Sequence, residues 1–256
     1  QGTDHLIILS SQPPVTFFAY PDKPNYLTPE GCELHTLVER DEDIDGALEA
    51  LIDAVDAGST EANVVVHKVP DMPQDGPLDQ RNIGNALAHL FPEDAIVVDE
   101  GGTCGGGCTA ATRSAAPHDF LMLTGGAIGF GLPCATGAAV ACPDRPVISL
   151  QADGSGMYTN QALWTQAREQ LNVTTIIFAN QKYSILQIEF GRVGAHNPGP
   201  KAMSMLDLTN PEIRWTDIAK GMGVPAWRVT TVSEFAEAFQ RAQASPGPAL
   251  IEAIVP

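Results

Sequence analysis

Two polar side chains, Asp153 and Asn180, each follow an apolar run and have the chemistry to bind a metal ion. The runs, residues 147–150 and 173–178, indicate two buried parallel strands joined by a helix. A unit of this kind places both side chains at the carboxyl edge of the sheet, where open α/β sheets bind ligands. Carboxylate and amide oxygens suit Mg²⁺, which adds phosphate and water oxygens to a few protein ligands. The pattern therefore predicts a magnesium site.

The turn after Asp153 predicts an anion site beside the metal. Gly154 and Ser155 open a helix, so their backbone N–H groups can face an anion. A dinucleotide-binding turn is the main alternative, because Gly154-Ser155-Gly156 also follows a strand. Two features oppose it: Thr159 stands where a third glycine belongs, and the carboxylate would repel a pyrophosphate unless Mg²⁺ bridged them. A metal-diphosphate site is favoured over a nicotinamide site.

Three further turns are expected at the same edge of the sheet. Each follows a predicted strand, and two of them are rich in glycine, which permits close backbone approach to a ligand. A single glycine-rich turn after a strand is common and indicates little. The expected location of several such turns at one edge of the sheet is what indicates a ligand site. The turns are residues 100–103, 125–129 and 181–183.

Strands and helices alternate regularly only in the later part of the chain. Residues 70–77, rich in Pro and Gly, indicate a linker between a partial domain over 1–69 and a domain over 78–256. The later domain is predicted to be α/β, a doubly wound parallel sheet with helices on both faces. Trp164 is expected in its core. We expect strands at 5–10, 63–67, 95–99, 120–123, 147–150, 173–178, 226–229 and 249–254, and helices at 45–57, 78–90, 103–115, 133–141, 211–222 and 233–244.

Composition excludes several kinds of partner. The 256 residues have a net charge of −17 at pH 7 and 44% hydrophobic content. A core can form, whereas nucleic-acid binding and attraction to an anionic membrane are disfavoured. The longest stretch of small apolar residues, 127–142, is too interrupted by Gly, Pro and Thr to span a bilayer. We therefore expect a globular cytoplasmic protein.

The cysteines and histidines give no clear sign of a metal site. Of five cysteines only Cys104 and Cys108 are close in sequence. Without a second pair or nearby histidines, buried thiols are expected rather than zinc ligands. The six histidines are scattered, with no ligand spacing, and none is expected to be catalytic. They are His5, His35, His67, His89, His118 and His196.

The metal motif and one glycine-rich loop together resemble a known family. The loop over 125–133 reads Gly-Gly-Ala-Ile-Gly-Phe-Gly-Leu-Pro. With Asp153-Gly154-Ser155 and Asn180, it resembles the carboxyl-terminal portion of thiamine-diphosphate-dependent enzymes of the acetolactate synthase (large subunit) and benzoylformate decarboxylase superfamily. The resemblance begins near residue 78. It implies a thiamine-diphosphate-binding fold, preceded by the later half of a Rossmann-like central domain.

The resemblance implies a set of metal ligands. Asp153 and Asn180 would bind Mg²⁺ through their side chains, and Lys182 through its backbone carbonyl. Two neighbours depart from the family pattern: Ala152 stands where the motif usually has a glycine, and Ala179 where it usually has an asparagine. Neither change removes a ligand, so the implied site stays complete.

The same resemblance implies contacts to the diphosphate of thiamine diphosphate. Gly154, Ser155 and Tyr158 would hold it from one side, and Gly102 and Thr103 from the other. These five residues come from two separate turns after strands, as a cradle at one sheet edge requires.

Contacts to the rest of the cofactor are implied by the glycine-rich loop. The Gly126 carbonyl and the Ile128 backbone would bond the aminopyrimidine. The Ile128 side chain would keep the cofactor bent, which is its catalytic contribution, because the bent form sets the exocyclic amine beside the thiazolium C2. Candidates for the substrate pocket are Ile185, Leu186 and Glu189.

The implied reaction is the decarboxylation of a 2-oxo acid. The enamine left by loss of carbon dioxide is joined to a second carbonyl, as in acetolactate synthases, or protonated to an aldehyde, as in benzoylformate decarboxylases. Gly102-Thr103-Cys104 stands where acetolactate synthases usually carry Gln-His-Gln, and Glu189 where they carry tryptophan. Glu100 looks more like the decarboxylases. Both outcomes stay open.

The family's catalytic glutamate lies on a separate pyrimidine-binding domain, and nothing in this sequence resembles that domain. The resemblance therefore implies the carboxyl-terminal part of a longer polypeptide, or one partner of a split enzyme, with little activity in isolation. It also implies a homodimer or homotetramer, because relatives bind the cofactor between subunits. A different hypothesis is a non-catalytic remnant or regulatory module that keeps the diphosphate site.

Overall fold

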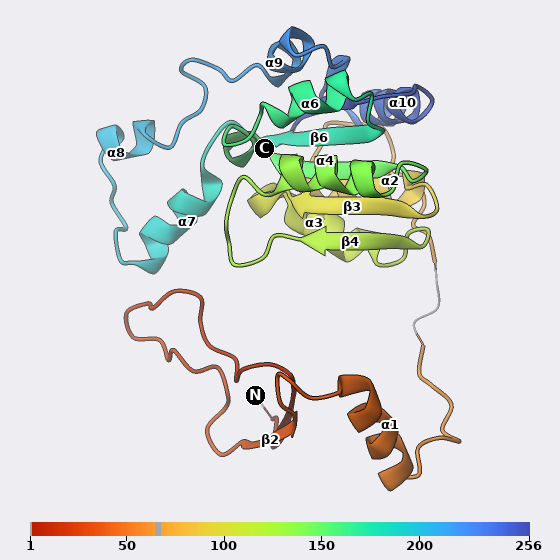
Figure 1. Cartoon of the computed structure of the whole chain (residues 1–256). Helices are drawn as coiled ribbons and strands as arrows, with labels where there is room; N and C mark the ends of the chain where they lie inside the picture. Colours follow the sequence, from red (N-terminus) through yellow and green to blue (C-terminus); the bar gives the residue numbers. More distant parts are fainter. Residues whose placement is uncertain (1, 65–67) are drawn as a thin grey trace. The chain divides into compact units, whose positions relative to one another are not determined.

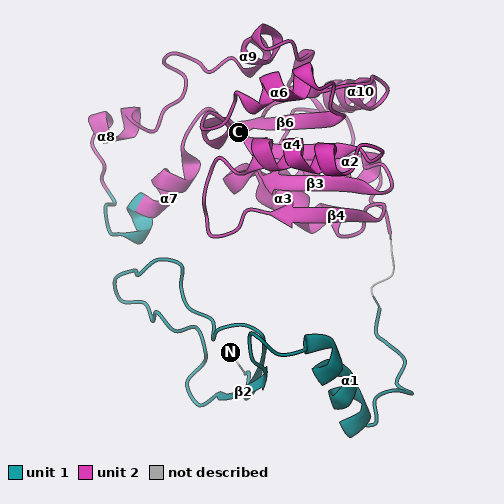
Figure 2. Ribbon diagram, in the orientation of Figure 1, with its two compact units in different colours: residues 1–65, 190–196 teal, residues 66–189, 197–256 magenta. Residues whose placement is uncertain are grey.

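The chain forms two compact units, which Figure 2 colours separately. The second unit carries a six-stranded sheet, and the first a two-stranded sheet. The computed structural model describes residues 2–64 and 68–256. The units comprise residues 1–65 with 190–196 (unit 1) and residues 66–189 with 197–256 (unit 2).

The described residues before 65 in unit 1 form a parallel strand pair and a helix. Strand β1, His5–Leu9, pairs with β2, Glu33–Val38, and helix α1 covers Ile44–Ala54. The Asp43 side chain accepts a hydrogen bond from Gly46 N at 3.2 Å, which caps the helix. The strand and helix expected near residues 5 and 45 are confirmed, whereas β2 was not expected.

Two predictions about this part of the chain stay predictions. The predicted limits of the partial domain and the linker, 1–69 and 70–77, stay predictions. The strand predicted at 63–67 falls largely on residues 65–67, which lie outside the described residues.

Unit 2 is built on one parallel sheet, with the strand order β4-β3-β5-β6-β8-β7 (Figure 1). The chain runs from β3 to its neighbour β4 on one side and returns to β5 on the other side of β3. This reversal is the kind of switch point at which doubly wound sheets bind ligands. The strands are β3 Ala95–Glu100, β4 His118–Met122, β5 Val147–Ala152, β6 Val173–Ala179, β7 Ala226–Val229 and β8 Ala249–Ile254.

Helices cover both faces of this sheet. On one face, Ile148 and Phe178 pack with α2, α3 and α10. On the other face, Ile177 packs with α4, α6 and α9. Neighbouring residues of the same strand thus enter different cores, and the expected doubly wound α/β fold is confirmed. The helices are α2 Gln80–Leu90, α3 Gly102–Thr112, α4 Gly131–Ala141, α5 Asp153–Gly156, α6 Ala162–Arg168, α7 Ser184–Arg192, α8 Pro200–Ser204, α9 Trp215–Gly221 and α10 Val232–Gln243.

The glycines of α2 and α3 let these two helices approach closely. A Cβ atom on Gly84 would lie 2.8 Å from the carbonyl oxygen of Gly107, and one on Gly107 would collide with the Gln80 carbonyl. Helix α3 is poor in helix-forming residues, so its stability depends on this packing rather than on intrinsic helix propensity.

One expected core residue is at the surface. Trp164 of α6 is 52% exposed, and the Arg168 guanidinium lies 5.1 Å from the centre of its ring. The neighbouring Leu163 is the residue that is buried. The prediction for Trp164 was wrong because the apolar positions of so short a helix leave its inward face ambiguous.

Within the described parts of the chain, we find no helix that combines the length and hydrophobicity needed to cross a bilayer.

Candidate functional site

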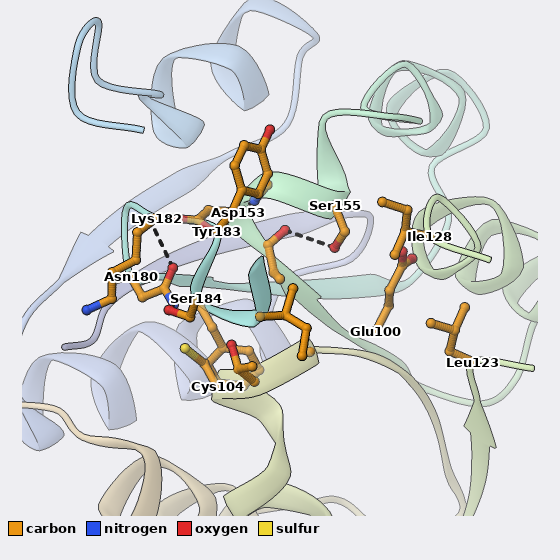
Figure 3. A pocket seen from close by; sticks show the side chains of 16 residues that line it. Glu100, Cys104, Leu123, Ile128, Asp153, Ser155, Asn180, Lys182, Tyr183 and Ser184 are labelled. Atoms are coloured by element: carbon orange, nitrogen blue, oxygen red, sulfur yellow. Dashed lines mark hydrogen bonds between the residues drawn. The ribbon is translucent and has the colours of Figure 1, made fainter. Parts of the chain in front are cut away.

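A cavity of about 410 Å³ lies at the carboxyl ends of β3, β5 and β6 (Figure 3). Its wall includes Glu100 from the end of β3, Asp153 after β5 and Asn180 after β6. Glu100 pairs with Gln151 in the register of β3 and β5, which brings these strand ends level. A volume of several hundred Å³ is typical of small-molecule sites, and this one lies at the topological switch point.

Asp153 is a buried carboxylate, only 4% exposed. Its Oδ1 accepts a hydrogen bond from Gly154 N at 2.8 Å, and its Oδ2 accepts one from Gln181 N at 2.7 Å. Burial raises the pKa of Asp153 to about 6, although both hydrogen bonds favour the charged form. The second bond joins the ends of β5 and β6, so the carboxylate is held in one orientation.

The Asn180 side chain is also fixed in place. Its amide nitrogen donates to Ser184 Oγ at 2.7 Å, and its Oδ1 accepts from Lys182 N at 3.2 Å. Figure 3 shows the latter bond as a dashed line. The Asn180 oxygen is thereby turned toward the turn that also carries Lys182.

The Lys182 carbonyl takes no part in the hydrogen bonds of the β-bridge in which Lys182 lies. Lys182 pairs with Asp207 in a short antiparallel bridge. The hydrogen bonds of this bridge run from Leu208 N to the Gln181 carbonyl and from Tyr183 N to Leu206 O, both at 2.9 Å. Because they use the residues on either side, the Lys182 carbonyl is a candidate ligand.

The turn after Asp153 fits closely against Tyr183. A Cβ atom on Gly154 would lie 2.5 Å from Tyr183 Cε1, so only glycine fits at this position with the ring where it stands. The Ser155 hydroxyl accepts a hydrogen bond from Gln151 Nε2 at 2.8 Å. On the other side of the cavity, Gly102 adopts a positive φ of 58° where it begins α3.

These donors fit a magnesium-bound diphosphate. A buried carboxylate and an amide oxygen are hard donors of the type Mg²⁺ prefers. The first residues of α3, Gly102 and Thr103, line the same cavity as Gly154 and Ser155. Backbone N–H groups at the start of a helix have no partner within the helix and bind anions.

Glu100 holds the glycine-rich loop. Its carboxylate is 4% exposed and accepts hydrogen bonds from Gly129 N at 2.5 Å and from Gly131 N. Ile128, which directly precedes Gly129, lines the cavity and is 48% exposed. Glu100 was expected in a turn at this sheet edge, but its contacts have no local signal, because its partners lie 29 and 31 positions later.

The cavity brings together most of the predicted site residues and omits four. Gly126, Tyr158, Leu186 and Glu189 are not among the residues that line it. Tyr158 is 63% exposed. The predicted residues that line it are Gly102, Thr103, Ile128, Asp153, Gly154, Ser155, Asn180, Lys182 and Ile185.

Several lining residues had no predicted role. Leu123 and Phe178 belong to apolar runs that indicate only buried strands, and Ser184 begins α7, which was not expected. Cys104 was expected as a buried thiol, and it is 3% exposed while also lining the cavity. Only the position of Cys104 within the glycine-rich start of α3 could have suggested this.

The fold and this site define a cofactor-binding domain of one family. Residues 101–253 match the family described as "Thiamine pyrophosphate enzyme, C-terminal TPP binding domain". Thiamine pyrophosphate is thiamine diphosphate, and the chain belongs to this family.

Two relatives show which members of the family this chain is similar to. The chain is 52% identical over 256 residues to "Putative acetolactate synthase large subunit IlvX" of Mycobacterium tuberculosis, covering 100% of this chain and 49% of the relative. It is 32% identical over 212 residues to a benzoylformate decarboxylase of Pseudomonas aeruginosa, covering 82% of this chain and 39% of the relative. The chain thus spans about half or less of the relatives it matches.

A solved structure of a related enzyme is also similar to this chain. The thiamine diphosphate-dependent 4-hydroxybenzoylformate decarboxylase of Rhodococcus jostii RHA1 matches with a TM-score of 0.77 and 26% identity. The match covers 98% of this chain and 49% of that one. The expected resemblance to acetolactate synthases and benzoylformate decarboxylases is therefore confirmed.

Proposed function

We propose that this chain binds thiamine diphosphate with Mg²⁺ in the cavity at the carboxyl edge of the sheet, as the diphosphate half of an enzyme acting on 2-oxo acids. One observation carries the proposal: the buried Asp153 carboxylate is held by two backbone N–H groups beside the Asn180 amide. Family membership supports the cofactor, and the names of the relatives support the class of substrate.

The metal ligands would be Asp153, Asn180 and the Lys182 carbonyl. A charged carboxylate in a buried position is costly when no cation is near. A Mg²⁺ ion would offset this cost and would convert the repulsion between Asp153 and a diphosphate into attraction. The orientation of Asn180 by Ser184 and Lys182 supports this role, because metal ligands are usually held by a second hydrogen bond.

The diphosphate would lie between two helix starts. Gly154 and Ser155 would hold it from one side, with Gly102 and Thr103 on the other. Tyr158 stays a predicted contact that would need to turn toward the cavity, because its side chain is mostly exposed.

The chain's own residues would orient the rest of the cofactor. The Ile128 side chain would press between the two rings and keep them bent, while the Gly126 carbonyl and Ile128 backbone bond the aminopyrimidine. Glu100 would keep this loop in place. When bound, thiamine diphosphate supplies the electron sink that allows a 2-oxo acid to lose carbon dioxide.

The reaction would end in one of two ways. The product is an aldehyde if the intermediate takes up a proton, and a longer hydroxy-oxo compound if it joins a second carbonyl. Ile185 lines the cavity and would contact the substrate, whereas Leu186 and Glu189 stay candidates near it. Product analysis of the complete enzyme with pyruvate and with benzoylformate distinguishes the two endings.

The site would be completed by a pyrimidine-binding domain, from the same longer chain or another subunit of a homodimer or homotetramer. Apolar side chains near the cavity are exposed, including Ile128 at 48%, Ile185 at 48% and Leu186 at 45%. Such a group of exposed apolar residues is typical of a surface that another protein covers. We expect the isolated chain to have little or no activity, and unaided turnover of pyruvate would contradict this part of the proposal.

Calorimetric titration of the chain with thiamine diphosphate, with and without Mg²⁺, tests the proposed site. We expect binding that requires Mg²⁺ and that weakens about 100-fold or more in Asp153→Ala, because a ligand and its hydrogen bonds are removed. The matched control is Asp144→Ala, since Asp144 is exposed and does not line the cavity. The control variant should bind as the unchanged chain does.

Two results would contradict the proposed site. One is binding that is the same with and without Mg²⁺ or in Asp153→Ala. The other is the absence of heat at millimolar cofactor and Mg²⁺ both for the chain alone and after addition of a pyrimidine-domain subunit.

A further inference from the structure

Three side chains of unit 1, which are far in sequence from the proposed cofactor site, bring potential metal-binding atoms close together. His5 Nδ1 lies 3.0 Å from His35 Nε2. Glu33 Oε2 lies 3.4 Å from His5 Nδ1 and 3.7 Å from His35 Nε2. The spacing of the histidines in the sequence gave no sign that these two lie together.

The pairing of β1 with β2 explains how they meet. In the parallel register, His5 stands opposite Glu33, and Ile7 stands opposite His35. Glu33 and His35 are two residues apart on one strand, so their side chains share a face of the sheet. The sequence signal was a Glu-x-His pattern, but the third member is on another strand, and the pairing of strands is not visible from spacing.

The three donor atoms have the separations that one small ion requires. A triangle with sides of 3.0, 3.4 and 3.7 Å has a circumscribed radius of about 2.0 Å. Zinc lies about 2.0–2.2 Å from imidazole nitrogen and carboxylate oxygen. An ion slightly above the plane of the triangle would therefore contact all three atoms at normal bond lengths, as at one face of a tetrahedron.

The arrangement of the two rings is compatible with a shared cation. Their centres are 5.2 Å apart and inclined at 40°, and a nitrogen of each ring faces the other. In neutral imidazoles, one of the facing nitrogens carries a proton and the other a lone pair. A bound cation would let both nitrogens and the Glu33 oxygen act as electron-pair donors toward one point.

We propose that His5, Glu33 and His35 bind a Zn²⁺ ion, with a fourth position open to water. Two imidazoles and a carboxylate suit zinc, whereas Mg²⁺ prefers oxygen ligands only. The ion reaches the site from solvent, because the side chains of His5, Glu33 and His35 are 62%, 69% and 50% exposed. The proposal is independent of the proposed cofactor site.

The consequence of zinc binding is a clamp between β1 and β2. A sheet of two strands has little stability by itself. One ion held by residues of both strands would stabilise their pairing, because it binds the folded arrangement and not the separated strands.

Titration of the full chain with Co²⁺, in a large excess of Mg²⁺, tests the proposal. Cobalt replaces zinc at sites of this type and absorbs visible light intensely when it has four or five ligands. We expect one equivalent of such absorption, displaced by Zn²⁺. His35→Ala should weaken Zn²⁺ binding by at least about tenfold, because a direct ligand is lost. Glu33→Gln, which keeps the size of the side chain, should weaken it as well.

Matched controls separate this site from other metal-binding groups. His196→Ala removes an exposed histidine outside the cluster, and Asp153→Ala alters the predicted magnesium ligand. Both should keep the absorption. The proposal would be overturned if the chain bound neither Co²⁺ nor Zn²⁺ with a dissociation constant of about 10⁻⁴ M or lower. Binding that is unchanged in both His35→Ala and Glu33→Gln would overturn it as well.

Discussion

The carboxylate of Glu100 and the backbone of Gly131 fit against each other so closely that Gly131 has no room for a side chain. Gly131 N donates to Glu100 Oε2, and a Cβ atom on Gly131 would lie 2.8 Å from that same oxygen and closer still to Gln151 Oε1. The other oxygen of Glu100 accepts from Gly129 N at 2.5 Å. One side chain at the end of β3 thus positions the loop that carries Ile128 to the cavity.

We expect Glu100→Gln to weaken binding of thiamine diphosphate with Mg²⁺ by about tenfold or more. The amide offers one acceptor oxygen, and its NH₂ group would face a backbone N–H, which costs about 1–3 kcal/mol when buried. Calorimetric titration measures the change. Glu237→Gln, at an exposed position of α10, is the control and should leave the affinity unchanged. Equal affinity in Glu100→Gln would show that the loop does not depend on this carboxylate.

The contact between α2 and α3 predicts opposite effects at neighbouring glycines. Gly107→Ala should destabilise the protein by about 1–3 kcal/mol, because the added methyl group collides with the Gln80 carbonyl. Gly106→Ala should stabilise it by about 0.5–1 kcal/mol, because there is open space around Gly106 and alanine favours helix. Chemical denaturation of both variants measures the difference. Similar effects at the two positions would contradict the observed packing.

Asp99 predicts a pH dependence of stability. Burial raises the pKa of Asp99 above its ordinary value of 3.8, although Gly101 N and Thr109 Oγ1 donate to it. The folded state therefore binds the proton more tightly than the unfolded state. The contribution to the free energy of unfolding is largest below pH 3.8 and is lost as the pH rises through the folded pKa.

Asp99→Asn should remove this loss. The asparagine oxygen can still accept from Gly101 N, and its NH₂ group can donate to the Thr109 hydroxyl. Relative to the unchanged chain, the variant should gain more stability at pH 7 than at pH 4, as measured by urea unfolding across that range. Asp144→Asn, at an exposed site, is the control. A gain that does not depend on pH would argue against a raised pKa for Asp99.

The buried thiols should react slowly even though one of them lines the cavity. Burial raises the pKa of both Cys104 and Cys108, and the thiolate is the form that reacts. In the folded chain we expect alkylation by iodoacetamide to be at least about tenfold slower at these two than at the partly exposed Cys142, as followed by mass spectrometry. Rapid labelling of Cys104 before Cys142 would contradict the closed packing around it.

The strands of unit 2 and their order along the chain were predictable because a buried strand is a short, mostly apolar run in the sequence. Every residue of β6 is buried, and all of them except Thr174 and Thr175 are apolar, which is typical of a strand covered on both faces. Asp153 and Asn180 follow such runs directly. Their meeting at one edge follows from parallel pairing alone, and the structure places both at the same cavity.

Other features depended on contacts between distant parts of the chain. Glu100 contacts Gly129 and Gly131 only after β3 and the start of α4 have packed together, and no local pattern specifies that contact. Strand β2 has mostly exposed residues, so it lacks the periodic burial that reveals a strand.

By itself, the sequence determined the parallel sheet of unit 2 and the residue types at its carboxyl edge, because hydrophobic periodicity and strand-end chemistry are local. The tertiary structure decided which side chains meet across elements: the Glu100 contact with the glycine-rich loop and the cluster of His5, Glu33 and His35. The physical reason is that such contacts depend on strand register and helix packing, which are set by the free energy of the whole fold rather than by neighbouring residues.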